Sequence, residues 1–190
     1  MARIFTKGVL NVPGCEWSLL IFRSSDFGSL RPLLSSALQD TLDQQVAIML
    51  TQSEWDYTDP ATFAPHLVSD PLPGVPAKKI LVQESVGDAQ VTNVATRVLA
   101  RTIGLDGFDL EHPIYGVPVK AAPLDSAYTQ WDSHPAIMPP ATNTALPKDN
   151  GAHDSVWRSD LAQTQIRAFM TKDGRATSVC AGGVCDISKK

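Results

Sequence analysis

The residues with the clearest potential for chemistry are an aspartate and a histidine placed beside predicted secondary structure. Asp88 comes shortly after a predicted strand at 79–85, and His153 lies in a glycine-containing loop that opens a predicted helix. In open α/β sheets, functional groups gather in loops at the carboxyl ends of strands. A carboxylate can orient an imidazole and stabilise the imidazolium, while the imidazole takes a proton from a nucleophile and later delivers it to a leaving group. We therefore take Asp88 and His153 as candidate catalytic residues.

No nucleophile for this pair is recognisable in the sequence. The chain contains no G-x-S-x-G motif, the strained strand-to-helix turn that exposes a catalytic serine. Gly28-Ser29 lies at an apparent helix start, and Ser85 ends a strand without the flanking glycines that such a turn needs. Cys15 follows a strand and a glycine and is the remaining alternative, although a buried, inert thiol is the simpler interpretation.

Both candidate residues also have a purely structural interpretation. Asp88 could cap the helix that begins near Ala89, since aspartate is a preferred N-cap. His153 could be an ordinary loop histidine near a helix start. The two catalytic assignments depend on the same fold and stand or fall together. Direct contact between the side chains favours the catalytic pair, whereas a separation beyond ~6 Å favours a non-catalytic module.

The cysteines and one acidic cluster are further candidates for binding. Cys180 and Cys185 bracket four small residues, a spacing that suits a disulfide loop, with free thiols as the alternative. They lack the second Cys or His pair of a good zinc site. A cluster in the middle of the chain could hold Ca²⁺ but lacks ordered ligand spacing, so a solvated loop is favoured; its members are Asp106, Asp109, Glu111 and His112. The four tryptophans could line an acyl pocket, although packing in the core or the lid is the simpler interpretation of each; they are Trp17, Trp55, Trp131 and Trp157.

Composition limits the possible partners. The 190 residues are 43% hydrophobic, enough for one domain with a real core. The formal charge is −4, and the lysines and arginines are scattered, which excludes the electrostatic footprint of a nucleic-acid-binding protein. No apolar run approaches the ~20 residues of a membrane-spanning helix. The first residues are basic and lack the apolar stretch of a signal peptide.

The elements that must position the candidate pair follow from local patterns. Residues 4–12 read as a strand stopped by Pro13-Gly14, and 79–85 is the clearest strand of the chain. After Asp88, apolar positions at helical spacing predict a helix that ends at Gly104; they are Val91, Val94, Ala95, Val98, Leu99 and Thr102. Strand, loop and amphipathic helix make half of a βαβ unit.

The remaining segments give weaker patterns. The apolar pattern in residues 17–70 predicts short helices that are interrupted by prolines. Asp59 is expected to be the N-cap of a helix that begins at Pro60. A proline-rich connector covers 71–76, and two short β-like stretches lie around 117–121 and 127–131. A loop covers 135–147. A helix is expected at 154–170, with one stripe formed by Trp157, Leu161 and Ala168.

Taken in order, several segments resemble the C-terminal part of large bacterial α/β-hydrolase-fold proteins. They are Gly8–Gly14, Arg23–Phe27, Trp55–Leu67, Ile80–Val91, Asn150–His153 and the tail with Cys180 and Cys185. The resemblance implies that 4–12 is the strand after the nucleophile helix and that 17–70 is a cap or lid. It also implies that Asp88 and His153 belong to a catalytic triad. Two departures matter: related hydrolases often have Val-Pro where this chain has Val91-Thr92, and the family's serine lies upstream of every segment present.

These observations predict a single α/β domain. Its core, residues 1–16 and 71–175, is a partial α/β-hydrolase-like parallel sheet of about three strands. Residues 17–70 form a helical cap insertion, and 176–190 form a cysteine-containing tail. Strand 4–12 would lack its upstream neighbour, so self-association or a partner that completes the sheet is expected. If Cys180 and Cys185 form a disulfide, the parent protein works outside the cytosol, in the periplasm or as a secreted protein.

The resemblance implies hydrolysis of a small-molecule ester or similar acyl substrate by a serine hydrolase. An upstream serine would attack, His153 would act as base and then acid, Asp88 would orient it, and no cofactor or metal would be needed. Without the nucleophile, the chain should be inactive or nearly so. The alternative is a non-catalytic binding or structural module in which Asp88 and His153 have no common role.

Overall fold

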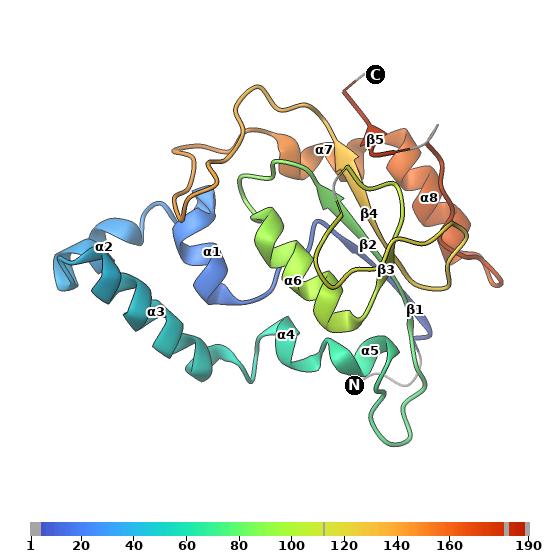
Figure 1. Cartoon of the computed structure of the whole chain (residues 1–190), viewed down its shortest axis with the longest axis horizontal. Coiled ribbons are helices and arrows are strands. Elements are labelled where there is room, and N and C mark those ends of the chain that lie inside the picture. Colours follow the sequence, from blue (N-terminus) through green and yellow to red (C-terminus); the bar gives the residue numbers. More distant parts are fainter. Residues whose placement is uncertain (1–4, 112, 181–182, 189–190) are drawn as a thin grey trace.

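The fold is built on a parallel β-sheet whose strands come from distant parts of the chain (Figure 1). The computed structural model describes residues 5–111, 113–180 and 183–188. The strand order is β1 (Lys7–Asn11), β2 (Lys79–Ser85), β4 (Ala127–Asp132) and β3 (Asp106–Gly107), and β5 (Cys185–Asp186) also pairs with β4. Every pairing is parallel. The predicted α/β class is confirmed, and the two short strands β3 and β5 make the sheet larger than the sequence predicted.

Helices cover both faces of the central strands. β2 has the predicted bounds, and nearly all of its residues are buried, as are all of those of β4. Val82 packs on one face with residues of helix α6 (Asn93–Ile103). Leu81 packs on the other face with Phe169 of helix α8 (Asp160–Met170). Burial on both faces is typical of parallel sheets and explains the apolar run in β2.

Polar side chains inside the central strands are paired. The fully buried Glu84 carboxylate of β2 accepts hydrogen bonds from Arg97 of α6, at 2.9 Å from Nη2, and from Gln130 of β4, at 3.2 Å. Gln83 donates to Gln165 of α8 at 2.9 Å. Because a buried charge or amide without a partner is costly, these contacts favour one register of strands and helices.

Residues 17–70 form a run of helices that extends to one side of the sheet (Figure 1). Helices were predicted for this segment, although α3, with 15 residues, is longer than the short helices expected. They are α1 (Trp17–Arg23), the 3-10 helix η1 (Ser25–Phe27), α2 (Arg31–Ala37), α3 (Thr41–Trp55), α4 (Pro60–Phe63) and α5 (Pro65–Val68). We call this segment the cap. In the described part of the chain, no helix is both long and apolar enough to span a bilayer.

Asp59 fastens the cap to the sheet. Its carboxylate accepts from the Ala61 amide at 2.9 Å, which confirms the predicted N-cap of α4. It also accepts from the amides of Glu16 and Trp17, at 3.0 and 3.2 Å, where the chain leaves β1 and enters α1. A single buried carboxylate therefore joins the start and the end of the cap.

Helix α6 is confirmed, but its predicted apolar face was rotated. Gly104 ends the helix in the left-handed conformation, with φ of 82°, as expected for a glycine C-cap. Val94, assigned to the buried face, is 37% exposed. The buried residues are Ala95, Thr96, Leu99, Ala100 and Ile103. Small side chains on this face let the helix approach the sheet closely, and periodicity of the larger side chains alone did not reveal them.

The helix predicted at 154–170 is two helices, α7 (Ala152–Arg158) and α8, separated by Ser159. The predicted stripe was wrong, since Trp157 and Leu161 are 47% and 43% exposed. Val156, Ala162 and Phe169 are buried instead. The break at Ser159, whose hydroxyl accepts from the Ala162 amide, changes the helical phase on which the predicted stripe depended.

Two further predictions concern the second half of the chain. Around 117–121 there is no strand, only isolated bridges that involve Val117 and Val119, whereas 127–132 forms β4. A disulfide joins Cys180 to Cys185, which settles the choice between paired and free thiols. It lies where the tail returns to pair with β4 as β5.

Candidate active site

Asp88 lies in the loop that follows β2 and is nearly inaccessible, with a side chain 2% exposed. One oxygen, Oδ1, accepts from the amides of Gln90 and Val91 at 2.8 and 2.9 Å. The other oxygen, Oδ2, faces His153. The prediction that Asp88 caps the following helix was wrong, because α6 begins at Asn93 and its N-cap is Thr92. One Asp88 oxygen instead binds two amides of the loop, and the other contacts the histidine.

His153 is the second residue of α7, and its Nδ1 lies 2.8 Å from Asp88 Oδ2. The structure thus brings together the two predicted site residues, which are 65 positions apart. A carboxylate can only accept this hydrogen bond, so Nδ1 carries the hydrogen. In the neutral ring, Nε2 then has a free lone pair and is the nitrogen able to take up a proton. The side chain of His153 is 24% exposed, which leaves part of the imidazole accessible.

The surroundings favour protonation of His153. The hydrogen bond to Asp88 is the largest influence and raises the pKa of the imidazole above its ordinary value of 6.5. Burial acts in the opposite direction, because it disfavours the charged ring. The negative charges of Asp88, Asp154 and Asp26 add to the increase. An imidazolium formed during a reaction would be stabilised at this position.

Two asparagines fix the loops that carry the pair. Asn93 accepts from the Gly87 amide at 2.8 Å and donates to the Ser85 carbonyl at 2.6 Å, which closes the loop around Asp88. Asn150 donates to the carbonyls of Gly87 and Ile137, both at 2.8 Å, and so ties the histidine loop to the aspartate loop. From the sequence, Asn93 was not singled out, and Asn150 was noted only as the first residue of the segment Asn150–His153. Their partners are backbone carbonyls and amides, which leave no sequence signature.

The cap borders the site through η1. The amide of Ser25 donates to the carbonyl of Ala89, at 2.8 Å, next to Asp88. Asp26 of η1 is among the charges that raise the pKa of His153. The site is therefore formed by three parts of the chain: the loop after β2, the start of α7 and the first turn of the cap after α1.

Neither candidate nucleophile, the thiol of Cys15 or the hydroxyl of Ser85, contacts the His153 ring. Cys15 is buried, its thiol donates to the Ala95 carbonyl at 3.4 Å, and burial raises its pKa to about 12, so it stays protonated. The Ser85 hydroxyl is buried and donates to the carbonyl of Ala152 at 2.7 Å. Within the described residues, no serine, threonine or cysteine hydrogen-bonds to the His153 ring. Ser85 instead supports the backbone just before His153.

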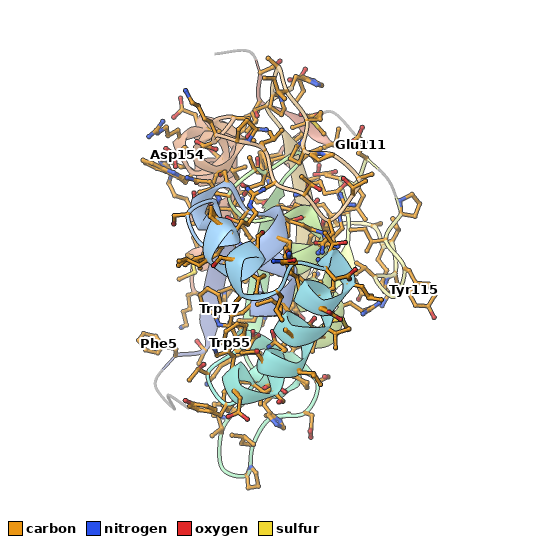
Figure 2. The ribbon with its side chains drawn as sticks, turned by 90° about the vertical axis from the view of Figure 1, so that its left-hand side faces the viewer. Phe5, Trp17, Trp55, Glu111, Tyr115 and Asp154 are labelled. Carbon is orange, nitrogen blue, oxygen red and sulfur yellow. A yellow bond between two sulfur atoms is a disulfide. The ribbon has the colours of Figure 1, made fainter. Side chains whose placement is uncertain are left out.

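The other predicted sites do not assemble as such. Asp106 forms an ion pair with Lys120 at 2.8 Å, and Asp109 turns toward the disulfide, so the described members of the acidic cluster do not converge on a common point. His112 lies outside the described residues. The tryptophans pack with different neighbours: Trp131 is fully buried in the sheet, while Trp17 contacts Phe27 edge-on at 5.9 Å. Figure 2 shows Trp17 and Trp55 on the cap, away from Asp154 at the start of α7.

Comparison of the chain with protein-family models, with curated proteins and with solved structures gives no significant match. The geometry of Asp88 and His153 is accordingly the main guide to function.

Proposed function

We propose that Asp88 and His153 are the acid and the base of a catalytic triad whose nucleophile lies outside the described residues. In this proposal the chain resembles the C-terminal half of an α/β-hydrolase that acts on esters or similar acyl substrates. The observation that carries the proposal is the 2.8 Å contact between Asp88 Oδ2 and His153 Nδ1. It joins two loops that the resemblance had assigned to the acid and the histidine.

Three features support a catalytic role over a chance contact. Asp88 is almost fully buried and keeps its second oxygen occupied by two backbone amides, which prevents rotation of the carboxylate. His153 directs Nδ1 to this carboxylate and remains partly accessible. The loops that bear both residues are tied together by Asn150. Such prior orientation is what a general base requires.

The proposed chemistry assigns one task to each residue. His153 Nε2 would accept the proton of a serine hydroxyl as the oxygen attacks an acyl carbon, and would then give that proton to the leaving alcohol. Asp88 would stabilise the imidazolium in between. Water would then attack the acyl-enzyme with the same proton cycle in reverse order. The chain contributes no recognised serine elbow, so the pure chain should not turn over an ester.

The proposal is tested by completing the site. The reading frame upstream of residue 1 is expressed together with this chain, and the product is treated with a fluorophosphonate probe that labels activated serines. We expect labelling of a serine in a G-x-S-x-G motif, together with hydrolysis of a p-nitrophenyl ester. His153→Ala should reduce the turnover by roughly 10⁴-fold or more, as loss of a triad histidine does.

His134 provides a matched control. It also faces an aspartate, with Nδ1 3.1 Å from Asp132 Oδ2, but its side chain is 56% exposed. His134→Ala should leave labelling and turnover unchanged. Labelling that survives His153→Ala would refute the assigned base. Steady ester turnover by the pure chain, abolished by His153→Ala, would instead refute the requirement for an external nucleophile.

A purely structural role is the second candidate, and the bonds from Gln90 and Val91 to Asp88 favour it. Asp88→Asn separates the two. The amide oxygen can still accept both backbone bonds, while the negative charge is lost. A structural brace predicts that the Asp88→Asn variant of the completed protein keeps full activity. The triad predicts a loss of about 10⁴-fold.

A further inference from the structure

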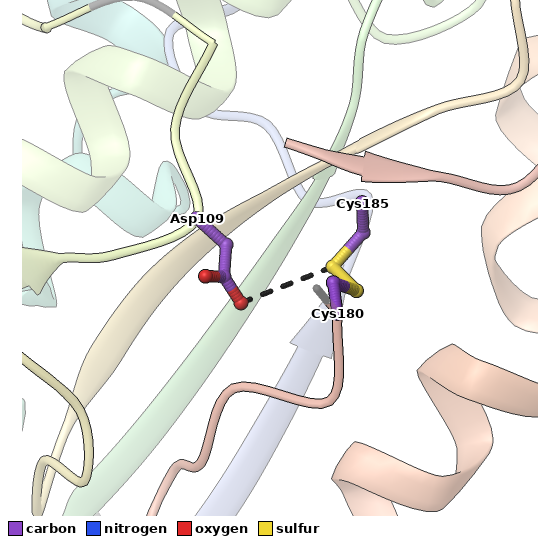
Figure 3. Close-up of side chains that lie close together, drawn as sticks. All are labelled: Asp109, Cys180 and Cys185. Atoms are coloured by element: carbon purple, nitrogen blue, oxygen red, sulfur yellow. Dashed lines mark hydrogen bonds between the residues drawn. A yellow bond between two sulfur atoms is a disulfide. The ribbon is translucent and has the colours of Figure 1, made fainter. Parts of the chain in front are cut away.

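Three side chains converge at the C-terminal tail. Asp109, Cys180 and Cys185 each place one potential ligand atom within 4.8 Å of the other two (Figure 3). Asp109 Oδ2 lies 3.9 Å from Cys185 Sγ. The cysteines form a disulfide, and the carboxylate comes from the loop after β3, more than 70 residues earlier in the chain. Nothing in the sequence pattern places the acidic residue beside the two sulfurs.

The carboxylate gains little from this position in the disulfide form. A disulfide sulfur has no hydrogen to donate, so the close contact with Cys185 is not a true hydrogen bond. The hydroxyl of Ser178 is a hydrogen-bond partner of the Asp109 carboxylate. Within the described residues, no cationic side chain forms an ion pair with it. Asp109 also has a left-handed backbone, with φ of 54°, which aspartate adopts more readily than most residues.

We propose that reduction of this disulfide creates a binding site for a thiophilic divalent cation such as Zn²⁺. A dithiol or phosphine reductant supplies two electrons, the bond between the two sulfurs breaks, and two thiols form as two protons are taken up. The cation then replaces both protons and is held by two thiolates and the Asp109 carboxylate. This argument is independent of the function proposed for Asp88 and His153.

The geometry suits this set of ligands. Zinc binds thiolates at about 2.3 Å and carboxylates at about 2.0–2.2 Å, so neighbouring ligand atoms in a tetrahedral site lie about 3.5–3.8 Å apart. The distance between Asp109 Oδ2 and Cys185 Sγ, 3.9 Å, is already close to this value. The two sulfurs must separate, and the carboxylate already lies within 4.8 Å of both. Cys185 is buried and held by β5, whereas Cys180 is partly exposed, so Cys180 is the residue expected to move.

Three protein ligands leave one position of a tetrahedral cation open to water or a further ligand. The oxidised form cannot bind in this way, because both sulfurs are used in the covalent bond. The tail would therefore alternate between two cross-links that hold β5 near β4: a disulfide under oxidising conditions and a metal bridge under reducing conditions.

The test uses the full chain with Cys15→Ala, which removes the one other thiol. The protein is reduced with a phosphine, separated from the reductant without air, and titrated with Co²⁺. We expect thiolate-to-cobalt charge-transfer absorption that saturates at one cation per chain and is displaced by Zn²⁺. The oxidised protein should show none.

Asp109→Asn is the decisive variant, because asparagine also tolerates a left-handed backbone. It should weaken the apparent affinity for the cation by roughly tenfold or more. Asp106→Asn, three residues earlier in β3 and paired with Lys120, is the matched control and should bind like the parent. Equal binding by the Asp109 variant, or absorption that persists with Cys180→Ser, would overturn the proposed site.

A second measurement keeps the test valid if reduction loosens the tail. Zn²⁺ should raise the thermal unfolding midpoint of the reduced chain and leave that of the oxidised chain unchanged, because a ligand of the folded state stabilises it. If Zn²⁺ neither binds the reduced chain nor raises its midpoint, the disulfide is a plain cross-link and the proposal is wrong.

Discussion

At the level of single residues, two opposing influences set the pKa of His153. The bond to Asp88 favours the imidazolium, burial opposes it, and the bond is the stronger influence. A group whose pKa is higher in the folded than in the unfolded chain stabilises the fold at low pH. The stabilisation is fully present below pH 6.5, which is the ordinary pKa of histidine. It is lost as the pH rises through the higher pKa that His153 has in the folded protein.

The first prediction follows from this sign. Asp88→Asn should lower the pKa of His153, since burial then acts without the opposing carboxylate. Urea unfolding should show a larger loss of stability for this variant at about pH 5.5 than at about pH 9. The imidazole pKa is read from an NMR titration, with His134 as an internal reference in the same spectra. If the difference in unfolding free energy between the parent protein and Asp88→Asn grew toward alkaline pH, Asp88 would not be the group that raises the pKa of His153.

The second prediction concerns Asn150. Asn150→Ala removes two hydrogen bonds to backbone carbonyls and should cost about 1–2 kcal/mol of unfolding free energy. It should also lower the pKa of His153, because the loop that presents the ring is no longer tied to the Asp88 loop. Asn143→Ala is the control, since Asn143 bonds to Gln45 in the cap and not to the Asp88 loop. That variant should leave the pKa of His153 unchanged.

At the level of elements, Asp59 shows how one side chain can join several helices. It accepts bonds from the start of α1 and of α4, and also from Gln52 of α3. Asp59→Ala should therefore cost about 3 kcal/mol, because buried amides lose a charged acceptor. Asp40→Ala offers a comparison, since Asp40 is an exposed N-cap of α3 and its loss should cost about 1 kcal/mol. Equal effects in urea unfolding would show that Asp59 acts only as a local cap.

The elements also show which features could be predicted from the sequence. β2 was predicted with its bounds because the apolar run Ile80–Val82, preceded by a proline-rich connector and followed by Gly87-Asp88, is a clear local signal. β3 and β5 have two residues each, too few for any period, and form only because β4 is there to pair with. The break at Ser159 was missed because the apolar positions on both sides fit a single helix.

The candidate site was predictable in part for the same reason. Asp88 follows a recognisable strand and His153 opens a recognisable helix, and functional loops of a parallel sheet gather at the carboxyl ends of its strands. Asn93 and Asn150 hold those loops through backbone groups, which no residue pattern records. The approach of Asp109 to the disulfide depends on how two segments far apart in sequence meet along β4. That is a property of the folded chain alone.

At the level of the whole molecule, β1 is an edge strand. Among the described residues it pairs only with β2. An apolar pocket of about 230 Å³ adjoins it, lined in part by Leu10, Phe63 and Leu99. Phe5, just before the strand, is 63% exposed and projects away from the body of the protein (Figure 2). An unpaired edge beside apolar surface is a site for strand addition.

The last prediction is that a second copy, or a partner strand, pairs with this edge. Because the Val12 amide bonds to β2 and amides alternate along a strand, the Val9 amide faces outward. Val9→Pro should therefore abolish association in light scattering while the fold is retained, as proline is tolerated at an outward-facing edge position. Leu10→Pro, whose amide faces β2, should destabilise the fold instead. A monodisperse wild-type monomer with slow amide exchange at Val9 would contradict the prediction.

The opposite side of the sheet behaves differently, and this limits what such pairing can build. β3 lies along Ala127 and Tyr128 of β4, β5 lies along Trp131 and Asp132, and Gln130 accepts from the backbone of Glu111 between them. The far edge is therefore formed by β3 and β5, which have two residues each and offer a much shorter edge than β1. Two copies that pair through β1 would use the longer edge of each copy, so we expect a closed dimer with a two-fold axis and no continuing fibre.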